Sequence, residues 1–203
     1  MRVLRIPFST NVERIALTLG HKGLSVDWVD VDPADRAEVV RLSGQELVPV
    51  LEHEEHVLVD SPAILEYLEH RFPQPPLLPL DPARRAEVRS FCDWFNRVWK
   101  RPPNLIVTEE AKAEPDAGTL AALAEELAES LQVFEDLLAG GDFLFGELSL
   151  ADMTAFPFLK YGLLWTEGDP DRFHEVLRTH LQLAGRYPRL EAWIGRVDAL
   201  PRA

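Results

Sequence analysis

The stretch DSPAILEYLEHRFPQPPLLPLDP, residues 60–82, contains both a helix and the end of the domain to which that helix belongs. Ser61 followed by Pro62 is typical of a helix start, because serine can cap free backbone N–H groups and proline fits the first turn. The apolar spacing predicts that this helix runs from Ser61 to Arg71. The prolines between residues 72 and 82 can continue neither a helix nor a sheet, so they indicate a stiff, extended linker at a domain boundary.

The residues before this linker alternate between short apolar strands and amphipathic helices. Apolar side chains recur at helical spacing from Val12 to Leu19, and glycines at positions 20 and 23 end that helix. The polar stretch at residues 52–55 separates two short strands and is typical of a hairpin turn. The predicted order is therefore βαβαββα, with strands at residues 3–6, 26–31, 48–51 and 57–59 and helices at residues 12–19, 33–42 and 61–71.

The residues after the linker are predicted to be helical throughout. Ser149 and Asp152 have the spacing of a capping box, with aspartate in place of the usual glutamate. We therefore expect an N-terminal domain at residues 1–73, the linker at 74–83 and an all-helical domain at 84–203. The apolar stripes that would form the helical core are Val88, Phe91, Cys92, Phe95 and Val98, and then Leu120, Leu123, Leu127, Leu131, Phe134 and Leu138.

Acidic residues outnumber basic ones in this chain, with 34 Asp and Glu against 21 Lys and Arg. A negatively charged surface repels phosphate backbones and anionic lipids, so nucleic acids and membrane surfaces are not expected partners. A single cysteine cannot form an internal disulfide, and the N-terminus lacks the layout of a signal peptide. These features favour a cytoplasmic protein.

Four stretches, in this order and spacing around the linker, resemble the cytosolic glutathione S-transferases: PFSTNVER, VPVL, DSPAILEYLE and SLAD. The resemblance extends over nearly the whole chain. It implies a thioredoxin-like N-terminal domain followed by an all-helical domain, which is the glutathione S-transferase fold, and it implies a homodimer. It also implies that glutathione is the co-substrate.

Asp60 and Ser61 occupy the positions at which this family holds the γ-glutamyl end of glutathione. The resemblance implies that Asp60 pairs with the α-ammonium group of the ligand and that Ser61 donates to its α-carboxylate. A helix that begins here also offers free backbone N–H groups and the positive end of its dipole. The alternative is that Ser61 only caps the helix.

Val48 and Pro49 form a second candidate segment. In the resembling family this proline is cis, and the preceding residue offers its backbone N–H and C=O to the cysteinyl part of glutathione, as an added strand would. An ordinary edge-strand proline is the alternative. For the glycyl carboxylate the resemblance favours Arg36, although a solvated surface arginine explains that residue nearly as well.

Ser9 lies between the first strand and the first helix, five residues before Arg14. In the family, the Ser or Cys that activates the glutathione sulfur has this place and this spacing, so the chain resembles the serine type. We expect Thr10 or Asn11 to cap the helix, because Thr10-x-x-Glu13 fits a capping box, and the Ser9 hydroxyl then remains available. A thiolate is favoured near a helix N-terminus and a good hydrogen-bond donor, so Ser9 would stabilise the glutathione thiolate. The alternative is a solvated turn serine.

A pocket for the second substrate would involve the first helix of the C-terminal half. Trp94, Arg97 and Arg101 are expected on one face of it, away from the apolar stripe, and an aromatic ring beside two guanidinium groups suits a flat, anionic or electrophilic compound. The same face could instead contact a dimer partner or be solvated. His53 and His56 lack further ligands nearby in the sequence, so no metal is predicted.

The resemblance implies a glutathione-dependent transferase that conjugates the glutathione thiolate to a small apolar electrophile. Serine at position 9 cannot form a mixed disulfide, which favours conjugation, isomerisation or peroxide reduction over thiol transfer. Three alternatives remain open: a glutathione-dependent isomerase or peroxidase, an enzyme that uses another small thiol, and a protein of the same fold that catalyses nothing and serves as a binding or assembly module.

Overall fold

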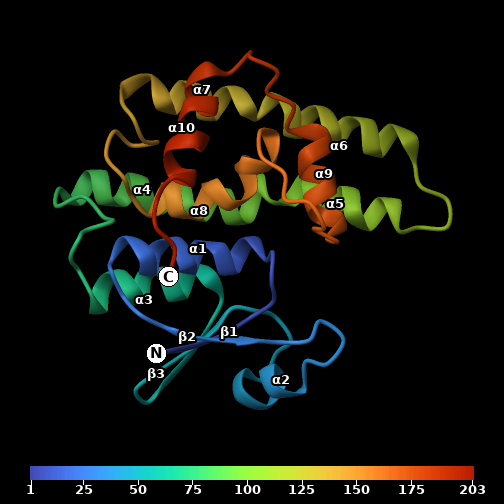
Figure 1. Ribbon diagram of the computed structural model, residues 1–203. Coiled ribbons are helices and arrows are strands. Elements are labelled where there is room, and N and C mark those ends of the chain that lie inside the picture. The colour runs from blue at the N-terminus through green and yellow to red at the C-terminus, as the bar shows by residue number, and fades with distance from the viewer. The chain divides into compact units, whose positions relative to one another are not determined.

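The computed structural model describes residues 1–203, which form two compact units. The first unit comprises Met1–Leu78 together with Leu200–Ala203, and the second comprises Pro79–Ala199. Figure 1 labels the helices and strands of both units. None of the helices is both long enough and apolar enough to cross a membrane.

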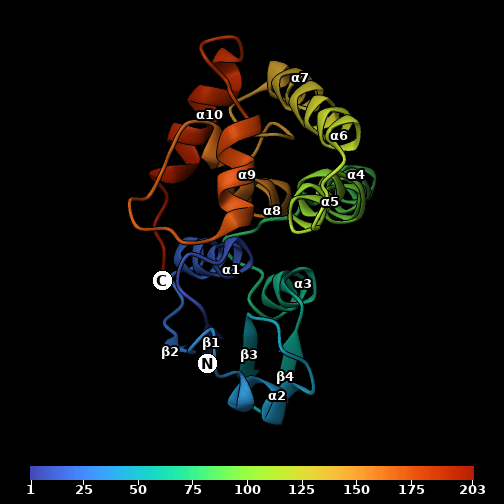
Figure 2. The ribbon, with the colours of Figure 1, turned by 90° about the vertical axis from the view of Figure 1, so that its right-hand side faces the viewer.

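The first unit contains a four-stranded mixed sheet and three helices, in the predicted order βαβαββα. Its elements are β1 (Arg2–Arg5), α1 (Thr10–His21), β2 (Asp27–Asp30), α2 (Ala37–Ser43), β3 (Val50–His53), β4 (His56–Val59) and α3 (Ser61–Arg71). The strands lie in the order β2-β1-β3-β4, with β1 parallel to β2 and antiparallel to β3, and β3 antiparallel to β4. α1 and α3 cover one face of the sheet and α2 covers the other (Figure 2).

The middle of the sheet, β1 and β3, is buried on both faces, which explains the apolar runs of these two strands. The outer strands β2 and β4 are half-buried or exposed. Val3 and Leu4 are neighbours in β1 and point to opposite faces, yet both are fully buried. On one face Leu4 packs with Val39 of α2 and Val50 of β3. On the other face α1 and α3 pack against each other, and this contact sets the start of one helix near the start of the other.

α2 and β3 both begin later than the sequence predicts. α2 begins at Ala37 rather than at residue 33, because Asp32 and Asp35 each accept a hydrogen bond from the backbone N–H two residues on (2.8 and 3.1 Å) and hold the segment in turns. β3 begins at Val50 rather than at residue 48, because Pro49 has no N–H to contribute to the ladder.

The last residues of the chain belong to the first unit, so the prediction that they lie in the helical domain is wrong. The N–H of Ala203 donates to the carbonyl oxygen of Ala16 in α1 (3.1 Å), and the Ala203 carbonyl accepts from the indole of Trp28 (3.1 Å). Gly20 permits this contact, since a Cβ atom there would lie 2.2 Å from the carbonyl oxygen of Pro201. The segment forms no helix or strand, so apolar periodicity contains no sign of its position.

A buried ion pair anchors the proline-rich linker to the first unit. The Nζ atom of Lys22, just after α1, donates to Oε2 of Glu69 in α3 (2.6 Å) and to the carbonyl oxygens of Phe72 (2.7 Å) and Pro75 (3.0 Å). The other carboxylate oxygen of Glu69 accepts from the backbone N–H groups of residues 77–78 (3.0 and 3.1 Å). The Lys22 side chain has no exposed surface, and all three of its N–H groups have acceptors.

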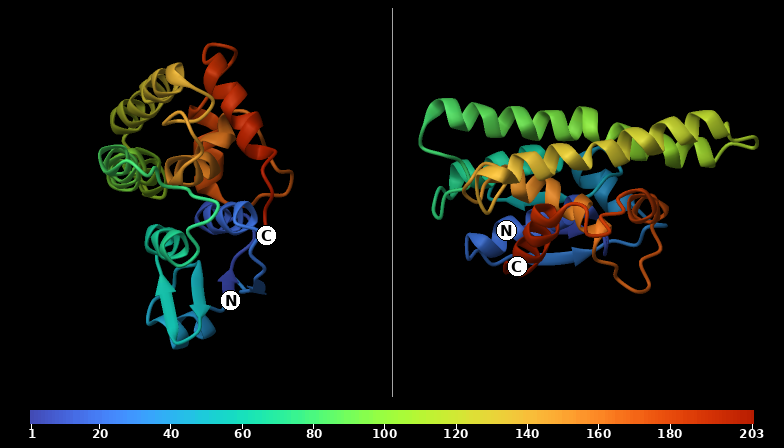
Figure 3. Two further views of the ribbon diagram at one scale, coloured as in Figure 1. Left: turned by 90° about the vertical axis from the view of Figure 1, so that its left-hand side faces the viewer. Right: turned by 90° about the horizontal axis from the view of Figure 1, so that it is seen from above.

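The second unit consists of helices. They are α4 (Pro82–Trp94), α5 (Arg101–Glu110), α6 (Ala117–Glu129), α7 (Leu131–Leu137), α8 (Leu150–Leu159), α9 (Arg172–His180) and α10 (Pro188–Asp198). α4 and α5 form one long rod, and α6 and α7 form a second rod beside it (Figure 3). Every residue of α8 is buried, as expected for a helix that is apolar on all sides.

A π-helical segment, Phe95–Trp99, joins α4 to α5 and changes which residues face the core. The prediction that Val98 continues the apolar stripe is wrong: Val98 is 50% exposed, and Trp99 is buried instead. The wider turn of a π-helix shifts the buried face by one residue. The Trp99 ring stacks on the Phe95 ring, with centroids 4.4 Å apart.

The predicted capping box at the start of α8 is confirmed, with Ser149 as the N-cap residue and Asp152 as its partner. Asp152 is fully buried and accepts four hydrogen bonds. Two come from the N–H and the hydroxyl of Ser149 (2.9 and 3.0 Å), one from the N–H of Leu144 (3.0 Å) and one from the indole of Trp193 (2.8 Å). This carboxylate therefore connects α8 to α10 and to the loop before α8.

Candidate functional site

Ser9 is the N-cap residue of α1. Its Oγ atom accepts a hydrogen bond from the N–H of Val12 (3.4 Å), so the prediction that Thr10 or Asn11 caps this helix is wrong. The cause is local, because a turn closed by the Ser9 N–H on the carbonyl of Ile6 (3.3 Å) leaves Ser9 with non-helical backbone just before the first helical residue. A hydroxyl that accepts a hydrogen bond keeps its proton, so Ser9 can still donate to a ligand.

A buried polar network that the sequence did not predict connects Ser61 to α1. The Nη1 atom of Arg14 donates to Oγ of Ser61 (3.1 Å) and to Oδ1 of Asn11 (3.3 Å), and the Ser61 hydroxyl donates to the same Asn11 oxygen (3.2 Å). Arg14 is fully buried. The network joins the first turns of α1 and α3, so the N-termini of both helices lie close together.

Asp60, and not Ser61, occupies the N-cap position of α3. Ser61 is the first helical residue, and no side chain caps this end of the helix. The φ angle of Asp60 is 68°, in the left-handed region that residues other than glycine rarely adopt, and the side chain is exposed. The start of α3 therefore presents backbone N–H groups without a side-chain cap, next to an exposed carboxylate.

The peptide bond between Val48 and Pro49 is cis, as the resemblance implies. In the β3–β4 pairing Val50 lies opposite Val59, which brings the residues before β3 next to residues 60–61. No backbone–backbone hydrogen bond uses the N–H or the C=O of Val48. These groups can therefore pair with an extended ligand segment as a further strand would.

Arg36 forms no hydrogen bond or ion pair with Val48, Asp60 or Ser61 in the structure. It precedes α2, and its Nε and Nη1 atoms donate to the carbonyl oxygens of Pro33 (3.2 Å) and Glu46 (2.9 Å). The guanidinium group thus ties the turn before α2 to the loop after it. Its role in binding a glycyl carboxylate stays a prediction.

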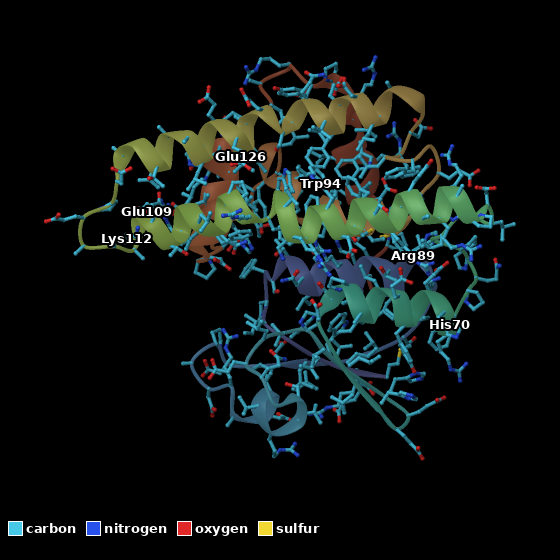
Figure 4. The ribbon with its side chains drawn as sticks, turned by 180° about the vertical axis from the view of Figure 1, so that it is seen from behind. His70, Arg89, Trp94, Glu109, Lys112 and Glu126 are labelled. Atoms are coloured by element: carbon cyan, nitrogen blue, oxygen red, sulfur yellow. The ribbon has the colours of Figure 1, made fainter.

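Trp94, Arg97 and Arg101 do not form one group. The Trp94 ring packs against the rings of Phe91 (centroids 5.6 Å apart) and Phe134 (6.0 Å), on the side of α4 that faces α7 (Figure 4). The prediction that Trp94 points away from the apolar stripe is therefore wrong. Arg97 and Arg101 are both exposed. Their part in binding a second substrate stays a prediction.

The site as a whole suits an anionic ligand. The N-termini of α1 and α3 each carry positive partial charge and favour carboxylates or thiolates. The Ser9 hydroxyl lies at the first of these ends, and the uncapped N–H groups and the Asp60 carboxylate lie at the second. A ligand with both an ammonium and a carboxylate group matches the second end.

Two family models match the chain. The N-terminal domain of glutathione S-transferases matches residues 4–76, and the C-terminal domain of glutathione S-transferases matches residues 117–196. The chain belongs to the glutathione S-transferase family. The glutathione S-transferase fold predicted from the sequence is thereby confirmed, together with its thioredoxin-like sheet and its helical second part.

Relatives of this family member differ in the functions that their names describe. FtsZ-localized protein A of Caulobacter vibrioides is 32% identical over 171 residues, which cover 76% of this chain and 73% of that protein. Glutathione transferase omega-1 of Caenorhabditis elegans is 24% identical over 197 residues, which cover 97% of this chain and 76% of that protein. A glutathione S-transferase of Methylobacterium radiotolerans, solved in complex with glutathione sulfonate, is 25% identical with a TM-score of 0.77, and the match covers 100% of this chain and 95% of that one.

Proposed function

We propose that this protein is a glutathione-dependent transferase that conjugates the glutathione thiolate to a small apolar electrophile. The observation that carries the proposal is the place of Ser9 at the N-terminus of α1, with a hydroxyl proton left to donate. The network of Arg14, Asn11 and Ser61 sets the uncapped N-terminus of α3 close to this hydroxyl. Glutathione is a tripeptide thiol with an α-amino acid group at one end, so it needs both the Ser9 hydroxyl and the N-terminus of α3.

In this proposal the three parts of glutathione bind to different groups. The Asp60 carboxylate pairs with the α-ammonium group. The Ser61 hydroxyl turns its one proton from Asn11 to the α-carboxylate, which the N–H groups at the start of α3 also bind. The backbone of Val48 pairs with the cysteinyl residue, which directs the sulfur toward Ser9. Arg36 would bind the glycyl carboxylate.

The Ser9 hydroxyl acts by donating a hydrogen bond to the sulfur. Hydrogen bonding to the charged form of an acid lowers its pKa, so the bound thiol releases its proton to solvent near neutral pH. The sulfur then gives an electron pair to the electrophilic carbon, and the C–S bond forms as the leaving group departs with its own electron pair. Serine does not compete as a nucleophile, and the rate increase comes from supplying an oriented thiolate.

We further propose that the protein is a homodimer, as the resemblance implies, and that it is cytoplasmic and takes part in detoxification. Light scattering at micromolar concentration tests the dimer. A mass equal to twice that of the chain supports it, and the mass of one chain contradicts it.

Reduced glutathione is expected to raise the thermal unfolding midpoint of the protein. A ligand that binds only the folded state adds about 2.7 kcal/mol at a hundred times its dissociation constant, so millimolar glutathione shifts the midpoint clearly if the affinity is micromolar. Asp60→Ala should remove most of the shift, because the α-ammonium group loses its partner. The matched control is Asp27→Ala, an exposed aspartate of β2, which should keep the full shift. A midpoint that glutathione does not move in any variant contradicts glutathione binding.

A binding or assembly module is the second candidate function. The relation to FtsZ-localized protein A favours it, because that relative is named for its location and not for a reaction. Glutathione binding without turnover of any electrophile, isomerisable substrate or peroxide would favour this candidate over a transferase, an isomerase or a peroxidase. Turnover that depends on Ser9 would favour the enzyme.

A further inference from the structure

The segment Leu200–Ala203 lies beside α1 in the first unit (Figures 1 and 2). The N–H of Ala203 donates to a carbonyl oxygen of α1, and the carbonyl of Ala203 accepts from the indole of Trp28. Arg202 forms an ion pair with Glu13 of α1. Because these contacts involve both the backbone and a charged side chain, they fix the position of the segment along the helix.

Gly20 is required for this contact between α1 and the segment. It lies within α1, which continues to His21, although glycine is a poorer helix residue than alanine. A Cβ atom on Gly20 would lie 2.2 Å from the carbonyl oxygen of Pro201 and 2.6 Å from its carbonyl carbon. These are backbone atoms, which cannot rotate away as a side chain can. An alanine at position 20 would therefore push the segment away from the helix.

The Arg202 ion pair brings a positive charge to the first turn of α1. The Nε and Nη2 atoms of Arg202 donate to Oε1 of Glu13 (3.2 and 2.9 Å), and its Nη1 atom donates to the carbonyl oxygen of Leu200 (3.2 Å). The side chains of Arg202 and Glu13 are 31% and 15% exposed. The guanidinium group is thus oriented by its own segment as well as by the carboxylate, and water screens the pair less than it screens a fully exposed pair.

Glu13 has a charge that acts on the position of Ser9. The N–H of Glu13 donates to the carbonyl oxygen of Ser9 (3.0 Å), and residues four apart lie on the same face of a helix. A carboxylate in the first turn stabilises the helix, because this end of the helix dipole is positive. The same carboxylate opposes a thiolate bound at this end, since like charges disfavour each other. A cation that pairs with Glu13 reduces this opposition, and the structure places Arg202 there.

We propose that Arg202 is a positioning residue for the thiolate site at Ser9 and that residues 200–203 hold it against Glu13. Through this pair Arg202 offsets a negative charge one helical turn from Ser9 and keeps the N-terminus of α1 favourable to a thiolate. The inference rests on the proposed function, because the thiolate is that of glutathione. The charge balance at Ser9 can also be measured without glutathione.

A thiol introduced at position 9 reports this charge balance. In the variant Ser9→Cys, thiolate absorbance in the ultraviolet gives the pKa of the new thiol, after subtraction of the parent protein with its single Cys92. Adding Arg202→Gln should raise this pKa by about 0.5–1, as expected for a partly screened charge one helical turn away. Adding Arg71→Gln, which breaks an exposed pair with Glu54 at the opposite end of α3 from Ser61, is the control and should leave this pKa unchanged.

Two further variants distinguish the charge of Arg202 from a structural role of the segment. Removing both charges, with Arg202→Gln and Glu13→Gln together, should return the pKa of the position-9 thiol to its value in Ser9→Cys, because Arg202 acts through Glu13. Gly20→Ala keeps both charges but displaces the segment, so it should raise this pKa as Arg202→Gln does. The effect of Arg202→Gln should shrink between about 0.01 M and about 1 M salt, whereas salt would not screen a structural effect.

A pKa of the position-9 thiol that Arg202→Gln leaves unchanged overturns the proposal, and so does a rise that persists in the variant without both charges. With Ser9 in place, Arg202→Gln should likewise raise the pKa of the bound glutathione thiol, and Arg71→Gln should not. If the position-9 thiol responds to Arg202 but glutathione does not bind, the proposed function fails while the effect of Arg202 on the charge at Ser9 stands. If glutathione binds with a lowered thiol pKa that is indifferent to Arg202, the proposed function stands and the role of Arg202 is wrong.

Discussion

Replacing Lys22 by methionine is expected to lower the free energy of unfolding by about 3–5 kcal/mol, which is the usual cost of removing one partner of a buried ion pair. Methionine has a similar length but cannot donate hydrogen bonds. The buried Glu69 carboxylate then has no cationic partner, and the carbonyl oxygens of Phe72 and Pro75 lose their donor. The linker segment also loses its connection to the end of α1. Urea denaturation followed by circular dichroism measures the loss.

Two variants distinguish the stability lost with the Lys22–Glu69 ion pair from a general effect of substitution. Replacing both partners, Lys22→Met with Glu69→Leu, should recover part of the loss, because no uncompensated charge remains buried. Arg5→Met breaks a more exposed pair with Asp30 in the same unit, and it should cost less than about 1 kcal/mol. If Lys22→Met costs no more than Arg5→Met, the buried pair does not anchor the linker.

The other large effect is expected for Asp152→Ala in the helical unit. The substitution removes the acceptor of four hydrogen bonds and leaves the donors of Leu144, Ser149 and Trp193 buried. Each buried donor without an acceptor costs about 1–3 kcal/mol, and water that enters the space recovers part of this, so we expect a loss of about 3–5 kcal/mol. The midpoint of denaturation by urea provides the measurement. An alanine variant as stable as the wild type contradicts the role of this carboxylate.

The variant Asp152→Asn distinguishes the contribution of the carboxylate charge to stability from the contribution of the hydrogen bonds. Its carbonyl oxygen can still accept, but its NH₂ group opposes the N–H of Ser149, so an intermediate loss is expected. Burial raises the pKa of Asp152 above its ordinary value, although the four hydrogen bonds oppose the shift. The folded state then binds more protons than the unfolded state between the two pKa values, so wild-type stability falls as the pH rises through that range. The stability difference between the wild type and Asp152→Asn should therefore narrow with rising pH.

The sequence predicted those parts of the fold that depend on a periodic apolar pattern or on residues close together in the chain. The apolar runs of β1 and β3 and the helical spacing in α1 predict the element order directly. Ser61, Pro62 and the prolines of the linker predict both ends of α3. The capping box of Ser149 and Asp152 was predictable because capping depends on residues only three positions apart.

The parts that the sequence did not predict depend on contacts between distant residues. Lys22 and Glu69 are 47 positions apart, and so are Arg14 and Ser61. In the sequence Lys22 and Glu69 are ordinary polar positions, and nothing there pairs Arg14 with Ser61. Arg14 had one sign of a special role, its place on the helix among buried apolar positions, because a buried arginine needs a polar partner nearby.

The N-cap residue of α1 was predicted incorrectly for a different reason. Ser9, Thr10 and Asn11 are all good N-cap residues, and the Thr10-x-x-Glu13 spacing favoured Thr10. The turn that closes on Ile6 decides in favour of Ser9. This outcome matters for the site, because Ser9 has to cap the helix and donate to the ligand with one hydroxyl group.

The pKa of the glutathione thiol in the complex tests most directly whether Ser9 stabilises the thiolate. Thiolate absorbance in the ultraviolet, measured against pH with saturating glutathione, gives this value for the wild type, for Ser9→Ala and for the control Ser90→Ala, an exposed serine of α4. If Ser9 donates to the sulfur, the pKa of the bound thiol lies well below the ordinary value of about 8.5 in the wild type and the control, and it returns toward that value in Ser9→Ala. A bound thiol whose pKa is the same with and without the Ser9 hydroxyl would contradict the assignment of Ser9 as the thiolate donor.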